Sequence, residues 1–255
     1  MRRIRRGGQR MSGPDSRLNG AAYASSIQSN PSDVSYRRAF QSVALALVPV
    51  GGALFDFGCG PGIDARFYAE HGRRVAAFDV DPGMCEHFAH GCRDLMASGA
   101  VTLLCAGYRE FLAGAAPAQP APVTLVTANF APLNLIDDLA ELFARFALLT
   151  SATGAVLASV LSPYFAGDLR YRWWWRNAPR LLWHGRYAVA GAETLIWRRG
   201  LADFAAACAP HFALEEVFAG STTRVHAARA TWLKLTRCRY MFLLFRKPAG
   251  AARAV

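Results

Sequence analysis

The stretch Leu54-Phe55-Asp56-Phe57-Gly58-Cys59-Gly60-Pro61-Gly62 decides the fold of this 255-residue chain. An apolar run ends here in glycines, and a helical pattern follows over residues 63–71. Glycine lets the backbone turn sharply and leaves no side chain between the backbone and a ligand. The first N–H groups of the helix are then available to polar ligand atoms. Strand, turn and helix in this order indicate either a nucleotide-like ligand or a tight structural turn.

Strands and helices alternate around this stretch. The pattern predicts five strands, at 53–57, 74–79, 101–106, 123–128 and 155–161. Helices are predicted between them, over 63–71, 83–98 and 137–149. This spacing is typical of βαβ units and a parallel sheet. A short helix at 201–209 and two more strands, at 212–218 and 239–246, complete the pattern.

The segments differ enough in composition to divide the chain. Its predicted parts are a disordered basic tail (1–20), a helical lid (21–52), a core (53–161), an aromatic and basic cap (162–199), the C-terminal part of the core sheet (200–247) and a tail (248–255). The hydrophobic fraction of 53% supports a large core. No apolar run reaches the roughly 18 residues of a membrane span, and residues 1–6 lack the apolar stretch of a signal peptide. We therefore expect a cytoplasmic protein without a membrane span.

The cysteines, histidines and net charge exclude several classes of function. Six cysteines show no CxxC spacing, which indicates reduced thiols, and His87 and His90 lack a third ligand, so no metal is expected. The net charge of +11 comes from residues 1–20, 162–199 and 221–255. No nucleic-acid module accompanies it, so we expect no nucleic-acid partner. A basic mouth for an acidic acceptor and a simple bias toward arginine both remain open.

Further motifs follow the glycine loop in a fixed order, and over residues 21–247 the chain resembles a class I S-adenosylmethionine-dependent methyltransferase of the small-molecule type. Residues 56–62 are similar to the family's D-x-G-C-G-x-G, and residues 79–84 to its D-x-S-P-x-M. Asp79 ends the second strand, and Asn129 ends the fourth. Ile63 stands where a dinucleotide-binding loop has its last glycine, which disfavours NAD or flavin.

The resemblance implies an α/β fold, with a doubly wound, mostly parallel sheet of seven strands in the order 3-2-1-4-5-7-6 and an antiparallel last strand. It implies S-adenosylmethionine as cofactor and S-adenosylhomocysteine as product. The implied cofactor-binding residues are Tyr23, Asp56, Gly58, Cys59, Gly60, Asp79, Val80, Met84, Tyr108, Arg109, Asn129 and Asn134.

Individual roles within this set differ in how far the pattern supports them. Asp79 is implied to bind the ribose hydroxyls, and Asp56 to lie near the cofactor's amino group. Met84 lies against adenine or is a core methionine, and Asn134 pairs with Asn129 or starts the next helix. Tyr108 replaces the aspartate that many relatives have after the third strand. Outside the set, we expect Asp81 to cap the next helix, and the helix dipole accounts for Asp64.

The segment 162–199 combines tryptophans and tyrosines with seven arginines. As a cap it is expected to bind a small-molecule acceptor, acidic or aromatic, through Tyr164, Arg170 and Trp174, together with Tyr36 of the lid. The alternatives are that its tryptophans pack the cap onto the sheet or form a homodimer contact. Contact with a membrane surface is disfavoured because the sequence shows no amphipathic helix of sufficient regularity. No motif fixes a general base, for which the candidates are Tyr23, Tyr36, Tyr164, His184 and His226.

The predicted function is methyl transfer to a small-molecule acceptor in specialised metabolism. Direct displacement at a sulfonium requires mainly alignment and desolvation. Two alternatives are an enzyme that uses S-adenosylmethionine for other chemistry, such as its intramolecular cyclisation, and a non-catalytic binding protein with the same fold.

Overall fold

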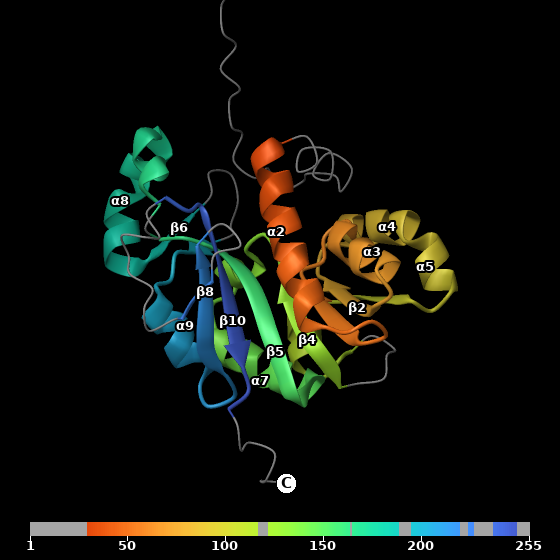
Figure 1. Ribbon diagram of the computed structural model, residues 1–255. Helices are drawn as coiled ribbons and strands as arrows, with labels where there is room; N and C mark the ends of the chain where they lie inside the picture. Colours follow the sequence, from red (N-terminus) through yellow and green to blue (C-terminus); the bar gives the residue numbers. More distant parts are fainter. Residues whose placement is uncertain are drawn as a thin grey trace, which may run out of the picture.

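The protein is described by a computed structural model over residues 30–116, 122–163, 165–188, 195–219, 224–226 and 237–248. One sheet of eight strands forms its centre, and helices cover both faces (Figure 1). The strands are β1 (Ala53–Phe57), β2 (Arg74–Asp79), β3 (Val101–Cys105), β4 (Val123–Ala128), β5 (Thr150–Leu161), β8 (Ala213–Ala219), β9 (Arg224–His226) and β10 (Tyr240–Arg246).

The strand order is β3-β2-β1-β4-β5-β10-β8-β9. Strands β1 to β5 pair in parallel, and β10 runs antiparallel to both β5 and β8. The predicted order of seven strands is therefore confirmed. The short strand β9, which the sequence did not predict, pairs antiparallel with β8 and adds an eighth. Because β1, β2 and β4 are adjacent and parallel, the polar residues at their carboxyl ends meet at one edge of the sheet.

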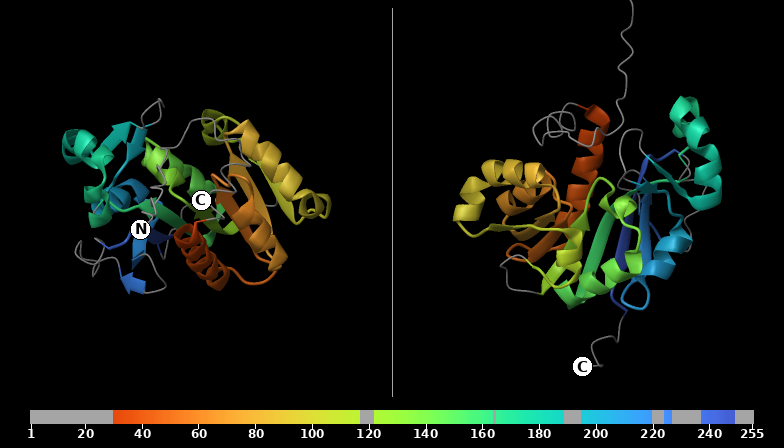
Figure 2. Two further views of the ribbon diagram at one scale, coloured as in Figure 1. Left: turned by 90° about the horizontal axis from the view of Figure 1, so that it is seen from above. Right: turned by 180° about the vertical axis from the view of Figure 1, so that it is seen from behind.

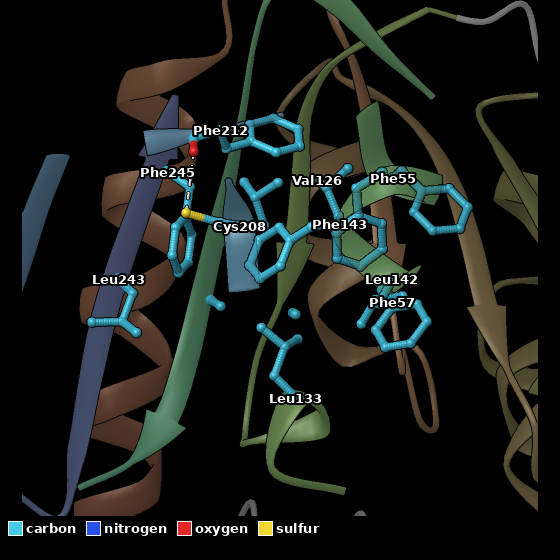
Figure 3. Packing of buried hydrophobic residues seen from close by; sticks show 14 of the residues in the cluster. Phe55, Phe57, Val126, Leu133, Leu142, Phe143, Cys208, Phe212, Leu243 and Phe245 are labelled. Atoms are coloured by element: carbon cyan, nitrogen blue, oxygen red, sulfur yellow. Dashed lines mark hydrogen bonds between the residues drawn. The ribbon is translucent and has the colours of Figure 1, made fainter. Parts of the chain in front are cut away.

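Two hydrophobic clusters lie on opposite faces of the sheet. One face is covered by α2 (Pro31–Leu47), α3 (Ile63–Glu70), α4 (Pro82–Gly91) and α5 (Arg93–Ala97), and the other by α6 (Tyr108–Leu112), α7 (Leu139–Leu149) and α9 (Leu201–Cys208). On the second face, the Phe143 ring of α7 lies 4.9 Å from that of Phe245 in β10 (Figure 3). With helices on both sides, every residue of β1 is buried, as expected of a central parallel strand.

Three predicted boundaries were wrong. The single helix expected at 83–98 is two helices, since α4 ends at Gly91 and α5 begins at Arg93. Strand β5 begins at Thr150 instead of residue 155, with an irregular register where Val123 and Leu125 of β4 pair with it. No helix or strand was predicted at residues 108–112, where the structure has the short helix α6.

The cap contains regular elements of its own. They are the 3₁₀ helix η2 (Ala166–Arg170), helix α8 (Arg172–His184) and a two-stranded antiparallel sheet of β6 (Arg186–Ala188) and β7 (Leu195–Trp197). The cap lies at the opposite end of the molecule from α4 and α5 (Figures 1 and 2). In the chain it follows the end of β5 and precedes α9. The predicted tail 1–20 and almost all of 248–255 lie outside the described residues.

Candidate functional site

The loop between β1 and α3 is held in a conformation that only glycine adopts easily. Gly58, Gly60 and Gly62 have φ values of +68°, +53° and +86°. A Cβ atom on Gly58 would come within 2.8 Å of the Pro132 side chain. The Gly58 N–H group donates to the Phe78 carbonyl oxygen over 2.9 Å, which fixes the loop against the end of β2. The loop thus exposes bare backbone at the carboxyl edge of the sheet.

Asp79 lies directly beside this loop at the end of β2. Its side chain is buried, with Oδ2 accepting from the Gly60 N–H group at 2.7 Å and Oδ1 from the Asp81 N–H group at 3.0 Å. Burial raises its pKa, and these backbone N–H groups oppose that shift. Each carboxylate oxygen can accept a further hydrogen bond, so the geometry fits a ligand that carries hydroxyl groups.

Asp56 has a buried oxygen atom without a partner. Its Oδ1 accepts a hydrogen bond from the Thr127 hydroxyl at 2.9 Å, while Oδ2 has no hydrogen-bond partner among the described residues. Burial, and next the nearby charge of Asp64, raise the pKa of Asp56 to about 8. An unpaired buried acceptor is costly unless something binds it. The site therefore fits a ligand donor, above all an ammonium group.

Asp64 joins three elements at the same place. It accepts hydrogen bonds from Arg37 Nη1 at 2.5 Å and Gln41 Nε2 at 2.7 Å, both on α2, and from Asn129 Nδ2 at 3.0 Å, after β4. The sequence analysis attributed Asp64 to the helix dipole, and that account was incomplete. The arginine and glutamine were missed, although their i, i+4 spacing on the apolar side of α2 is a usable signal.

The turn after β4 is strained. Phe130 and Ala131 have φ values of +61° and +70°, which cost about 1 kcal/mol or more each for residues other than glycine. Two hydrogen bonds hold the turn: the Phe130 N–H group donates to Asn129 Oδ1 over 2.9 Å, and the Ala131 N–H group to the Ser159 carbonyl over 2.9 Å. The Phe130 ring then faces the Arg37 guanidinium, 4.5 Å from its centroid.

These residues surround one pocket at the carboxyl edge of the sheet. Its lining residues are Arg37, Asp56, Gly58, Cys59, Gly60, Pro61, Asp64, Asn129 and Phe130. Backbone from the loop, two carboxylates and a guanidinium thus converge there. The glycine cradle and the unpaired oxygen of Asp56 fit a ligand with both a nucleoside and an amino-acid part.

The family model of a methyltransferase domain matches residues 54–154, which include the loop, Asp79 and Asn129. These residues form a class I S-adenosylmethionine-dependent methyltransferase domain. Its cofactor is S-adenosylmethionine, as the sequence analysis predicted.

Solved structures with similar folds agree with this assignment. An S-adenosylmethionine-dependent methyltransferase from Mesorhizobium loti has 21% identity and a TM-score of 0.60, with 85% of this chain and 100% of that chain covered. The CcbJ methyltransferase from Streptomyces caelestis has 15% identity and a TM-score of 0.62, with 92% and 100% covered. The 1,6-didemethyltoxoflavin-N1-methyltransferase of Burkholderia thailandensis, with S-adenosylhomocysteine bound, has 18% identity and a TM-score of 0.57, with 90% and 87% covered. No curated protein matches the chain.

Other residues expected at the cofactor site of this methyltransferase domain lie farther from the pocket. Val80 is exposed and Met84 is half-buried near the start of α4, which Asp81 caps as predicted by accepting from the Gly83 and Met84 N–H groups. The Tyr108 ring packs on the hydrophobic cluster of the α6–α7 face.

Arg109 is largely exposed and lies 3.9 Å from Glu141. Neither it nor Tyr108 lines the pocket, so their contact with the cofactor stays a prediction.

Asn134 connects the methyltransferase core to the cap, in a role that the sequence did not predict. It is buried in the 3₁₀ helix η1 (Pro132–Leu135). Its Oδ1 accepts from the Leu161 N–H group at 3.0 Å, and its Nδ2 donates to the Trp197 carbonyl. Both expected roles, pairing with Asn129 and starting a helix, were therefore wrong. Asn134 does not line the pocket, so its contact with the cofactor stays a prediction.

Tyr36 is the one candidate base that the described residues place beside the pocket. Its ring lies 5.5 Å from that of Tyr240, which in turn lies 5.6 Å from Phe130. Burial raises the pKa of Tyr36, so its hydroxyl keeps its proton at neutral pH. The sequence analysis missed Tyr240, because its place at the start of β10 depends on the order of the strands.

The remaining candidates are distant from the pocket or outside the described residues. His184 is exposed at the end of α8, and Arg170 is exposed on η2. Trp174 packs edge-on against Trp175, with ring centroids 4.9 Å apart. Tyr23, Tyr164 and the side chain of His226 lie outside the described residues.

Proposed function

We propose that this protein transfers a methyl group from S-adenosylmethionine to a small-molecule acceptor in specialised metabolism. The observation that carries the proposal is the pocket in which the glycine loop, the unpaired Oδ2 of Asp56 and the Arg37–Asp64 pair meet. It lies at the carboxyl ends of β1 and β4, where open α/β sheets bind their ligands.

The chain offers matched partners for the ribose and for the methionine part of the cofactor. Asp79 would hold the ribose hydroxyls, Asp56 the ammonium group and Arg37 the carboxylate of the methionine part. The loop glycines would let the backbone approach. When bound, the cofactor supplies a methyl group made electrophilic by the positive sulfur. Arg37 is in place for this carboxylate because Asp64 pairs with it, and Gln41 and Asn129 in turn hold Asp64.

The residues on the acceptor side provide alignment and exclude water. Phe130, Tyr36 and Tyr240 form an aromatic wall between α2 and the start of β10. Such a wall positions a flat or apolar acceptor. The Tyr36 hydroxyl, which keeps its proton, is a donor to the acceptor and not a base. An acceptor that carries its own unprotonated nitrogen or oxygen would need no base from the protein.

The cap carries a basic and aromatic surface. Its arginines lie over its aromatic rings, as Arg198 does with its guanidinium 5.9 Å from the ring centroids of both Trp173 and Tyr187. The Burkholderia thailandensis neighbour has the small molecule 1,6-didemethyltoxoflavin bound, which is consistent with a small acceptor here.

The proposal is tested first by calorimetry with S-adenosylmethionine and S-adenosylhomocysteine, with Asp56→Asn as control. If the protein binds neither compound, the result would favour a non-catalytic protein with the same fold. The second test is a panel of planar amines and phenols, with a methylated product detected by mass spectrometry. Incubation with the cofactor alone separates the cyclisation alternative, because methylthioadenosine formed without any acceptor would contradict methyl transfer.

A further inference from the structure

Helix α8 presents an apolar surface that the described residues leave open to solvent. None of its residues is buried, and Trp175, Leu182 and Trp183 expose 62%, 75% and 79% of their surface. Large exposed apolar side chains in one place mark a contact site. The helix stands at the outer end of the molecule, on the side where the parallel strands end (Figure 1).

The spacing of residues on α8 creates two parallel stripes. Trp175, Pro179, Leu182 and Trp183 follow a three-to-four residue spacing and share one side of the helix. Arg172, Arg176, Arg180 and His184 recur at every fourth residue and lie next to them. The helix carries no acidic residue.

The inner side of α8 packs against the two-stranded sheet of the cap. Trp173 stacks on Tyr187 of β6 with centroids 5.1 Å apart. On the outer side, Trp175 Nε1 donates to the Leu169 carbonyl over 2.7 Å. Its only polar group is thus satisfied within the chain. Only the apolar ring of Trp175 is then available to a partner.

We propose that the outer face of α8 binds the surface of an anionic lipid bilayer. The arginine stripe would contact lipid phosphates, while Trp175, Leu182 and Trp183 would enter the boundary between headgroups and acyl chains. Tryptophan suits this depth because its ring is apolar and its N–H polar. The sequence analysis disfavoured such a contact for lack of a regular amphipathic helix, and α8 is one. The contact is peripheral, since no helix in the described part of the chain is long and apolar enough to span a membrane.

Two other partners suit this surface less well. A second copy packed about a twofold axis would place the acid-free arginine stripe against itself or its neighbour, with like charges opposed. A nucleic acid would use the arginines but would leave Leu182 and its neighbouring rings facing phosphates and water. A convex helix with an apolar and a basic stripe matches a flat anionic surface. The inference does not depend on the acceptor or on methyl transfer.

The test is co-sedimentation of the full-length protein with phosphatidylcholine vesicles, with and without phosphatidylglycerol. We expect binding to the anionic vesicles, weaker binding in high salt and a blue shift of tryptophan fluorescence. Leu182→Gln combined with Trp183→Gln should weaken partitioning by at least about tenfold. Arg176→Gln combined with Arg180→Gln should weaken it by about 20-fold.

Leu148→Gln is the matched control, because Leu148 is also 75% exposed but lies on α7. Arg93→Gln on α5 is the control for charge. Neither should change partitioning, and circular dichroism and affinity for S-adenosylhomocysteine should stay constant in all variants. No binding to anionic vesicles would overturn the proposal. Binding that survives both α8 double variants would also overturn it, because the contact would then lie on another segment such as residues 1–20. The same holds if the protein binds duplex DNA through α8 but does not bind vesicles.

Discussion

The glycine-loop region is held together by a buried network of side-chain hydrogen bonds, whereas the cap combines one buried ion pair, Arg198–Asp168 at 3.0 Å, with several arginines stacked on aromatic rings. In the first, Asp64 alone accepts from three side chains of α2 and the β4 turn. In the second, Arg186 and Arg199 lie 4.8 and 4.7 Å from the Trp197 ring centroid. Buried networks require one geometry, while partly exposed stacking tolerates several. The contrast predicts that the glycine-loop side keeps one geometry, while the cap, which we propose binds the acceptor, tolerates more variation.

The largest effect should come from breaking the buried network. Arg37→Met leaves Asp64 buried without its ionic partner, because the two side chains are only 13% and 8% exposed. We expect the free energy of unfolding to fall by about 3 kcal/mol in urea titrations. Arg38→Met, at the exposed neighbouring position, is the control. If the free energy of unfolding fell by less than about 1 kcal/mol, the Arg37–Asp64 pair would contribute no more than a surface ion pair, and the buried network would not hold the site in one geometry.

Removal of the carboxylate at the end of β2 should affect binding more than folding. Asp79→Ala removes the acceptor of the Gly60 N–H group as well as the proposed ribose contact. Affinity for S-adenosylhomocysteine should fall by about 1.5–3 kcal/mol, measured by calorimetry. Asp79→Asn, which keeps one acceptor oxygen, should lose less. Unchanged affinity in the alanine variant would refute the ribose assignment.

The titration of Asp56 offers a test by pH. Its pKa of about 8 means that the free protein holds this carboxyl mainly protonated at pH 6.5. A bound ammonium group stabilises the charged form and lowers that pKa, so cofactor binding should release a proton. Affinity should then rise toward pH 8 by at most about 1.4 kcal/mol per pH unit. Calorimetry in buffers of different ionisation enthalpy detects the proton, and Asp56→Asn should abolish its release. Binding without proton release in the unmodified protein would exclude Asp56 as the ammonium partner.

The smallest effect should come from the cap. Trp173→Ala removes the stack on Tyr187 and should lower the local stability of α8 and β6 by about 1 kcal/mol. Amide hydrogen exchange in residues 172–188 should accelerate, with affinity for S-adenosylhomocysteine unchanged within about twofold. Trp183→Ala, on the outer face, should leave exchange unaltered. If Trp173→Ala weakened cofactor binding as strongly as Asp79→Ala does, the two regions would not be independent.

The sequence was sufficient for the fold and for part of the site. The strand order was implied by the resemblance to the methyltransferase family. The placement of Asp56, Asp79 and Asn129 could also be predicted from the residues, because each is a polar residue at the end of an apolar strand. Arg37 could not be assigned, since its partner Asp64 is 27 residues away on another helix.

Asn134 was assigned wrongly for the same kind of reason. Its role depends on the Trp197 carbonyl, 63 residues away in the cap. The residues next to Asn134 in the sequence carry no information on such long-range contacts. The end of a strand, in contrast, can be predicted from neighbouring residues alone.

The joint between cap and core has a consequence for how this protein can change over time. Asn134 donates to the Trp197 carbonyl, and Arg199 donates to the carbonyls of Ile136 and Asp137, each at 2.7 Å. Main-chain carbonyls are the same in every sequence, so the joint requires the side chains of Asn134 in the core and Arg199 at the end of the cap but places few demands on the rest of the cap. A different segment that keeps this arginine could therefore be grafted between β5 and α9 while the glycine-loop half stays as it is.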